Sequence, residues 1–155
     1  MAQSSIDVVP MSKELELPLI SEEISMPSID TQKLIEEDNS YRGQKPLRYG
    51  ARSILDIDPN ELGDLYITDE GKRIWRLAIR SENAYNMRIF LDNFMLVESA
   101  RLFFYNESYE DIYGAYTINN NSIDNTFSSP LVKGEVIIIE YNDDSNDPIS
   151  FNISS

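Results

Sequence analysis

Short runs in which apolar and polar residues alternate dominate the chain from residue 46 onward. Every second position is apolar between residues 85 and 92, and a similar alternation runs from 73 to 80. A period of two is typical of a β-strand that buries one face. Residues 136–139 are all apolar, which predicts a central strand covered on both faces. Further strands are predicted at 49–57, 62–68, 101–105, 112–118 and 149–154.

Clusters of turn-forming residues separate these runs. Asn, Asp, Pro and Gly gather at 58–60, 69–71, 119–121 and 142–144, and such residues favour tight turns. No long helical pattern intervenes between the predicted strands. The pattern therefore predicts an all-β fold, an antiparallel jelly-roll-like β-sandwich, for a domain of residues 46–155.

The beginning of the chain follows a different pattern. Residues 1–40 hold two lysines against nine acidic residues, a net charge of −7, and contain no aromatic residue. Pro10, Pro18 and Pro27 interrupt them, and their apolar residues stand singly or in pairs. This composition predicts an extended acidic arm or linker over residues 1–45. One short helix is predicted within it at 28–38, with Ser28 as its N-cap.

Composition narrows the function classes. The 155 residues include 13 Lys and Arg against 27 Asp and Glu, a formal charge of −14, with no His and no Cys. The absence of His and Cys excludes Ser–His and Cys–His nucleophile pairs and zinc held by His or Cys. The negative charge argues against nucleic acid as a partner, and no apolar run approaches the length of a membrane span. We therefore expect a non-enzymatic chain with no membrane span.

Carboxylates remain as candidates for chemistry. Glu140 follows the apolar run, and a glycosidase would need it to share a cleft with a second acid; the alternative is an ion pair with an Arg of a neighbouring strand. Asp143, Asp144 and Asp147 lie in an oxygen-rich segment like a Ca²⁺ loop, although EF-hand spacing is lacking. A solvated turn is the alternative there. We expect no cofactor, with Ca²⁺ as the candidate ion.

Three further residues are candidates for binding a partner. The alternation from 73 to 80 places Arg76 and Arg80 on one outward face of a strand, where they can meet the acidic arm, a partner or carboxylates of the same domain. Phe90 falls on the opposite face from its apolar neighbours and marks a candidate contact surface. Aromatic side chains of this kind also stack on sugars, although a role in the core is the alternative.

An ordered series of segments resembles one protein family. The segments are 46–50 (PLRYG), 69–81 (DEGKRIWRLAIRS), 84–87 (AYNM), 100–107 (ARLFFYNE), 114–117 (GAYT) and 132–141 (VKGEVIIIEY). Together with a lead-in at 26–38, the series is similar to the N-terminal non-catalytic domain of secreted lysyl-endopeptidase-like serine proteases of Bacteroidetes. The resemblance spans residues 26–153. It does not include the catalytic domain that follows in that family, so it assigns no catalytic residue.

The resemblance implies a pro-domain that assists folding of the protease, holds it inactive, or both. Its partner would be the serine protease catalytic domain, in cis or in trans. It also implies a secreted or cell-surface bacterial protein whose signal peptide has been removed. In this account the acidic arm crosses the substrate cleft and presents Lys13 or Lys33 to a Lys-specific pocket. A secreted or surface carbohydrate-binding or adhesion module is the alternative function.

Overall fold

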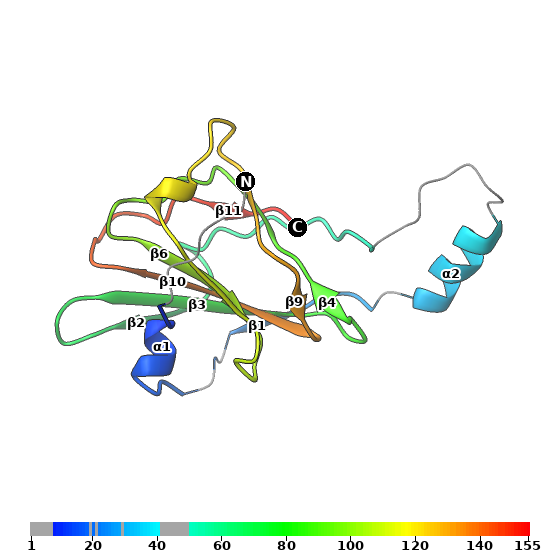
Figure 1. The fold of residues 1–155 in the computed structure, drawn as a ribbon, viewed down its shortest axis with the longest axis horizontal. Coiled ribbons are helices and arrows are strands. Elements are labelled where there is room, and N and C mark those ends of the chain that lie inside the picture. Colours follow the sequence, from blue (N-terminus) through cyan, green and yellow to red (C-terminus); the bar gives the residue numbers. More distant parts are fainter. Residues whose placement is uncertain (1–7, 19, 21, 29, 41–49) are drawn as a thin grey trace.

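The computed structural model describes residues 8–18, 20, 22–28, 30–40 and 50–155. Most of their regular secondary structure is β-strand (Figure 1). The helices are α1 (Met11–Glu14), α2 (Thr31–Ser40) and the 3₁₀ turn η1 (Ile118–Asn120). The strands are β1 (Glu23–Ser25), β2 (Asp64–Ile67), β3 (Arg73–Arg80), β4 (Asn86–Met87), β5 (Phe90–Asp92), β6 (Arg101–Tyr105), β7 (Ile112–Tyr116), β8 (Phe127–Ser128), β9 (Val132–Lys133), β10 (Val136–Asp143) and β11 (Asn152–Ile153).

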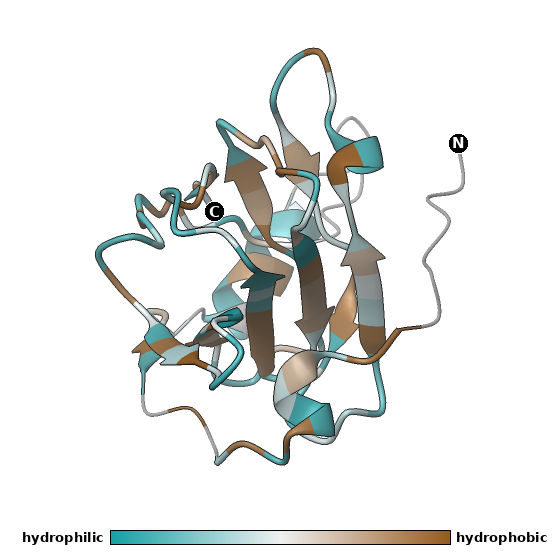
Figure 2. Ribbon diagram, turned by 90° about the vertical axis from the view of Figure 1, so that its left-hand side faces the viewer, coloured by the Kyte–Doolittle hydropathy of each residue, from teal (hydrophilic) through white to brown (hydrophobic). Residues whose placement is uncertain are grey.

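The larger sheet is built around β10. Its strands run in the order β1-β3-β10-β6-β7, and β2 also pairs with β3. β10 is antiparallel to both β3 and β6, and all of its residues are buried. Figure 2 shows the apolar colour concentrated in these central strands. The predicted central strand at 136–139 is therefore confirmed, and it continues to residue 143.

A second layer packs on one face of this sheet. It contains the three-stranded sheet β11-β5-β8, accompanied by the β4-β9 pair. Aromatic rings fill the space between the layers: Phe127 stacks on Phe94 with ring centroids 4.8 Å apart and on Phe104 at 6.0 Å. Trp75 meets Phe151 edge-on at 6.0 Å. The all-β class is confirmed, while the jelly-roll connectivity stays a prediction.

Several predicted strands differ in length from the observed ones. The strand predicted at 101–105 is β6 itself, and those at 62–68, 112–118 and 149–154 shorten to β2, β7 and β11. The run at 85–92 divides into β4 and β5, because β4 pairs with β9 whereas β5 pairs with β8 and β11. Of the strand predicted at 49–57, residue 49 lies outside the described residues, and the rest contributes one bridge, from Ile57 to Ile153.

The N-terminal segment, here residues 8–18, 20 and 22–25, is built into the domain instead of forming an extended arm. β1 adds to the edge of β3 as a parallel strand, with Glu23 opposite Ala78, and Met26 N–H donates to the Arg80 carbonyl at 2.7 Å. Ile20 packs on the face of the large sheet that the second layer leaves uncovered. The free edge of β3 supplies hydrogen bonds that composition alone does not reveal, so the prediction of an extended arm is wrong for these residues.

The predicted helix at 28–38 is observed as α2, shifted toward the C-terminus. The Asp30 carboxylate accepts the backbone N–H of Lys33 at 3.0 Å, so the cap is Asp30 and not Ser28. In Figure 1, α2 lies beside the sheets, at the opposite end of the molecule from the β2–β3 hairpin. Neither helix of the described chain has the length and apolar composition needed to cross a membrane.

Candidate functional site

A fully buried carboxylate, that of Glu140, marks the centre of the second face of the large sheet. Alternation along β10 turns Ile137, Ile139 and Tyr141 toward the main core, so Glu140 and Asn142 face the other way. The Glu140 side chain is 0% exposed. Burying a carboxylate is costly unless hydrogen bonds replace its hydration, so its partners decide whether the site is stable.

Three residues supply those hydrogen bonds. Ser12 donates its backbone N–H to Oε1 of Glu140 at 3.0 Å and its hydroxyl to Oε2. The Tyr105 hydroxyl donates to Oε2 at 2.6 Å, and the Asn142 amide donates to Oε1 at 2.9 Å. We call Ser12, Tyr105, Glu140 and Asn142 the Glu140 cluster. Its four donors satisfy both carboxylate oxygens without a cation.

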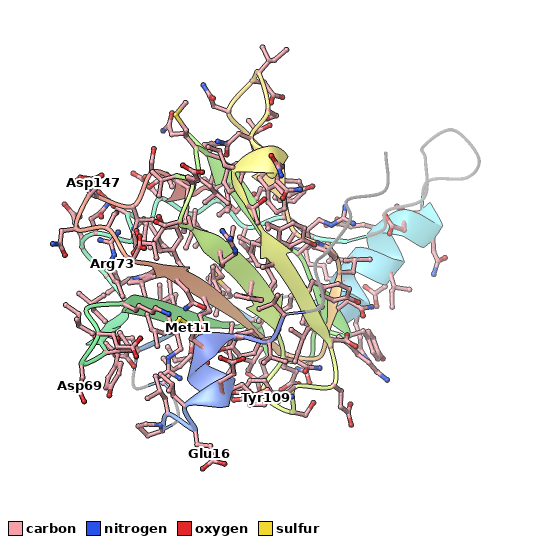
Figure 3. All side chains as sticks on the ribbon, turned by 60° about the vertical axis from the view of Figure 1, so that its left-hand side comes forward. Met11, Glu16, Asp69, Arg73, Tyr109 and Asp147 are labelled. Atoms are coloured by element: carbon pink, nitrogen blue, oxygen red, sulfur yellow. The ribbon has the colours of Figure 1, made fainter. Side chains whose placement is uncertain are left out.

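The first turn of α1 is capped by this cluster. Its N-cap position is Pro10, which makes no side-chain capping hydrogen bond. The backbone N–H of Met11 instead donates to Oδ1 of Asn142 at 3.3 Å, and that of Ser12 donates to Glu140. Side chains of the sheet thus accept hydrogen bonds from the N–H groups of the first turn, as the side chain of an N-cap residue does in other helices. Figure 3 shows α1 lying against the sheet with Met11 toward its centre.

Burial and the neighbouring carboxylate hold Tyr105 in its neutral form. Desolvation is the main cause that raises the pKa of Tyr105 far above its ordinary value, and the charge of Glu140 adds to it. A neutral hydroxyl is the form that can donate to Glu140. Tyr105 therefore keeps its proton, and the hydrogen bonds of the cluster suit a structural role better than an acid–base centre.

The predicted ion pair between Glu140 and an Arg is replaced by these hydrogen bonds. Arg76 lies directly opposite Glu140 in the β3–β10 register, yet its guanidinium donates to the Pro18 carbonyl at 3.2 Å. The prediction that Arg76 points outward is also wrong, because the N-terminal segment leaves it only 6% exposed. Its Nε has no hydrogen-bond partner among the described residues.

Arg80 is placed on the same face but near the surface. Its Nε donates to Glu23 at 2.8 Å, and its terminal nitrogens lie 3.2 Å from Glu107 and 3.9 Å from Glu135. The hydrogen bond to Glu23 is the main cause that raises the pKa of Arg80. Arg80 therefore joins the acidic N-terminal segment to two loops of the same domain.

The candidate Ca²⁺ residues do not come together. Asp143 is buried, and Arg73 donates to both of its carboxylate oxygens, at 2.8 and 2.7 Å. Asp144 and Asp147 are exposed beyond the end of β10, and Figure 3 shows Asp147 in the loop beyond Arg73. Within the described ranges, no three acidic side chains are arranged to hold a metal ion.

The remaining candidates are scattered over the surface. Lys13 lies on α1 with its Nζ 5.1 Å from the centre of the Tyr109 ring. Lys33 is exposed on α2. Phe90 is half-buried, and the guanidinium of Arg52 covers its ring at 5.0 Å. The predicted partner-binding residues thus form no single site.

Sequence reasoning missed Ser12 and Tyr105 as members of the Glu140 cluster. Ser12 stands in a polar stretch with no periodicity, and Tyr105 closes an aromatic run that predicts only burial. The one local signal was Glu140 itself, a charged residue directly after a run of apolar ones.

Comparisons with known proteins add no relative. No protein-family model, curated protein or solved structure matches the chain.

Proposed function

We propose that this chain is the non-catalytic N-terminal (pro-)domain of a secreted serine endopeptidase precursor, acting by binding the protease domain. The supporting observation is where the segments of the resemblance fall. Four of them, at 69–81, 100–107, 114–117 and 132–141, overlap β3, β6, β7 and β10 and supply core residues, while residues 46–49 of the first segment lie outside the described part of the chain. The similarity among the described residues therefore lies in the framework of the fold. Because a fold does not determine function by itself, the assignment to a protease precursor rests on this resemblance.

The polar clusters favour binding over catalysis. The carboxylate of Glu140 is enclosed by donors, and that of Asp143 is held by Arg73. A catalytic carboxylate has to reach a substrate in a cleft, whereas these two are 0% and 4% exposed. Both acids support the fold.

The two lysines differ in how they can meet a protease. Lys13 belongs to α1, which the Glu140 cluster fixes to the sheet, and its Nζ lies over Tyr109. Lys33 stands on α2, exposed and away from the sheets (Figure 1). We therefore assign the contact with the substrate cleft to Lys33. A domain that binds only the folded protease also stabilises it by mass action.

Titration of the chain into the protease domain encoded downstream tests this proposal. We expect saturable inhibition of peptide hydrolysis together with a stable complex. Lys33→Ala should weaken inhibition, and Lys13→Ala serves as the matched control. Substitution is preferable to deletion, because removing residues 1–40 also removes α1 and β1. Absence of both binding and inhibition at about ten micromolar, where weak complexes are already populated, would reject the proposal.

One observation favours carbohydrate binding as a second candidate function. A hollow beside β5 and β8 is lined by Arg52, Phe90, Asp92, Asn120 and Asp124, among others. It combines an aromatic ring with several polar side chains, as sugar sites do. A glycan array with wild type and Phe90→Ala tests it; equal signals from both proteins would remove this candidate. Trp75 is no reporter for this site, since it is buried in the core at 2% exposure.

A further inference from the structure

The outer edge of β2 exposes three consecutive apolar residues. Leu65 is 57% exposed, Tyr66 46% and Ile67 57%. Natural sheets protect their edges with lysine, proline, bulges or a covering segment, and residues 64–67 contain neither lysine nor proline. An apolar edge of this kind is a template for another strand.

The register shows which backbone groups face outward. β2 is antiparallel to β3, with Asp64 opposite Arg76 and Tyr66 opposite Ile74. Thr68 N–H donates to the Lys72 carbonyl at 2.8 Å, which makes residues 64, 66 and 68 the hydrogen-bonded positions. Because these positions alternate in an antiparallel pair, the N–H and C=O groups of Leu65 and Ile67 point away from β3. No other described backbone group hydrogen-bonds to them, so within that part of the chain they are available to an added strand.

A pocket opens beside this edge on the face of the main core. Leu62, Gly63, Leu65, Arg73, Trp75 and Ile149 contribute to its wall. Gly63 has φ +120°, and a Cβ there would overlap the Trp75 indole, whose Nε1 donates to the Leu62 carbonyl at 2.9 Å. The indole and the backbone are therefore fixed in place before any partner arrives. An apolar side chain of an added strand would fit against this wall.

Two kinds of strand can pair with the β2 edge: one from a second copy of this chain, or one from a different partner. The charges around the edge distinguish between them. Glu61, Asp69 and Glu70 are exposed around the two ends of β2, and Lys72 is paired with Glu70 at 3.8 Å. A second copy running antiparallel along the edge would bring its Glu61 close to Asp69 and Glu70, between molecules that each carry −14. Like charges at such a contact are unfavourable. A strand with basic flanks would be attracted instead.

We infer that the β2 edge binds an extended apolar segment flanked by Lys or Arg, by strand addition. The inference rests on the proposed function in that we assign this segment to the protease domain. It also adds to that function, since the docking edge lies at the opposite end of the molecule from α2 and Lys33 (Figure 1). The domain would then hold the protease at two separate points.

Leu65→Pro gives a sharp test in the full chain. Proline removes the outward N–H of Leu65 but leaves the hydrogen bonds from β2 to β3, which is why edge strands tolerate it. We expect Leu65→Pro to weaken binding of the protease domain about tenfold or more. Leu65→Thr, which keeps the N–H, should weaken it less. Ile123→Lys, on a loop residue that is 104% exposed, should have no effect. Thermal unfolding verifies that each variant is folded.

Hydrogen exchange with a probe peptide makes the test independent of the protease. The probe has alternating valine and threonine between lysines, and its control has glutamates in place of the lysines. We expect the lysine peptide to slow exchange at the Leu65 and Ile67 amides, and we expect the glutamate control to leave it unchanged. If the protease domain binds wild type and Leu65→Pro equally well, the inference is overturned while the proposed function stands.

If the protease domain fails to bind at all, the proposed function falls and the probe peptide decides the inference by itself. Absence of protection at Leu65 and Ile67 would then overturn it. So would a dimer of this chain that Leu65→Pro abolishes, because the second copy would be the occupant of the edge.

Discussion

The two faces of the central strand β10 are covered in different ways. On one face, Ile137, Ile139 and Tyr141 meet the second layer, where aromatic rings stack over a continuous apolar core. On the other face, Glu140 and Asn142 meet a single turn of helix through hydrogen bonds. The first face gains stability from apolar area removed from water, spread over many residues. The second combines a smaller apolar cluster, which includes Phe103 and Ile138, with a few polar groups, each of which has to be satisfied.

This difference predicts how each face responds to damage. Loss of apolar volume lowers the stability of the whole domain, because strands of both layers pack against one another in the same core. Loss of one polar partner should instead release the N-terminal segment and leave the rest of the sheet folded. The predictions below compare the two faces, in order of decreasing effect.

Alkaline pH should disrupt both faces together. Burial raises the pKa of Tyr116 to about 12, and it raises the pKa values of Tyr105 and Tyr141 further. The unfolded chain ionises these tyrosines at a lower pH than the folded one, so stability is intact below pH 10 and falls as pH rises through the folded values. Trp75 fluorescence should report unfolding above pH 10. Complete tyrosinate absorbance near pH 10 with the fold intact would contradict this.

Phe104→Ala tests the apolar face. Phe104 is 0% exposed and packs against Tyr116 and Phe127 with ring centroids 6.0 Å apart in both pairs. We expect a loss of about 3–5 kcal/mol in the free energy of unfolding, from lost transfer energy and an unfilled cavity. Equilibrium urea denaturation measures it. A loss below about 1 kcal/mol would mean that the core repacks around the cavity.

Glu140→Ala tests the polar face. Truncation leaves the Ser12 N–H and the Tyr105 hydroxyl without their acceptor, and we expect a loss of about 2–4 kcal/mol. Fast amide exchange should appear in residues 8–18 before it appears in β6. Glu140→Gln, which keeps the shape and one acceptor oxygen, should lie between wild type and Glu140→Ala. Uniform loss of protection over the whole domain would show that the two faces are not separable.

Arg80→Gln tests the surface contacts of the N-terminal segment. Arg80 has 34% side-chain exposure, and exposed ion pairs contribute about 0.2–1 kcal/mol. We expect a loss in that range that shrinks at high salt, as screening predicts. Lys72→Gln, at the exposed pair with Glu70, is the control and should change stability less. A loss independent of salt would assign the effect of Arg80 to packing.

Local periodicity predicted the parts of the fold in which burial repeats along a strand. β3, β6 and β10 were predicted because the apolar residues along each of them show which positions of that strand are buried. The burial of Arg76 was not predicted, because alternation shows on which face of the sheet its side chain lies but not which segment covers that face. Its cover comes from Pro18, 58 positions away in the sequence. The solvent exposure of Leu65, Tyr66 and Ile67 was equally hidden, since an apolar run looks the same in a central strand and at an edge.

The candidate site was harder to predict for a related reason. Glu140 stood out as a charge after an apolar run, but its natural partner by strand pairing was Arg76. The observed partner, Ser12, is a small polar residue in a segment with no pattern of its own. Hydrogen bonds from single backbone and hydroxyl groups leave little trace in a sequence, whereas an ion pair or a metal site draws on distinctive residue types.

The distance along the chain between Ser12 and Glu140 also has a consequence for biosynthesis. The two residues are 128 positions apart, and chains are elongated at roughly 5–20 residues per second. Ser12 therefore waits on the order of ten seconds for Glu140 to be made. During that time residues 8–18 have no partner in β10, and their charged side chains and lack of aromatic residues keep them hydrated.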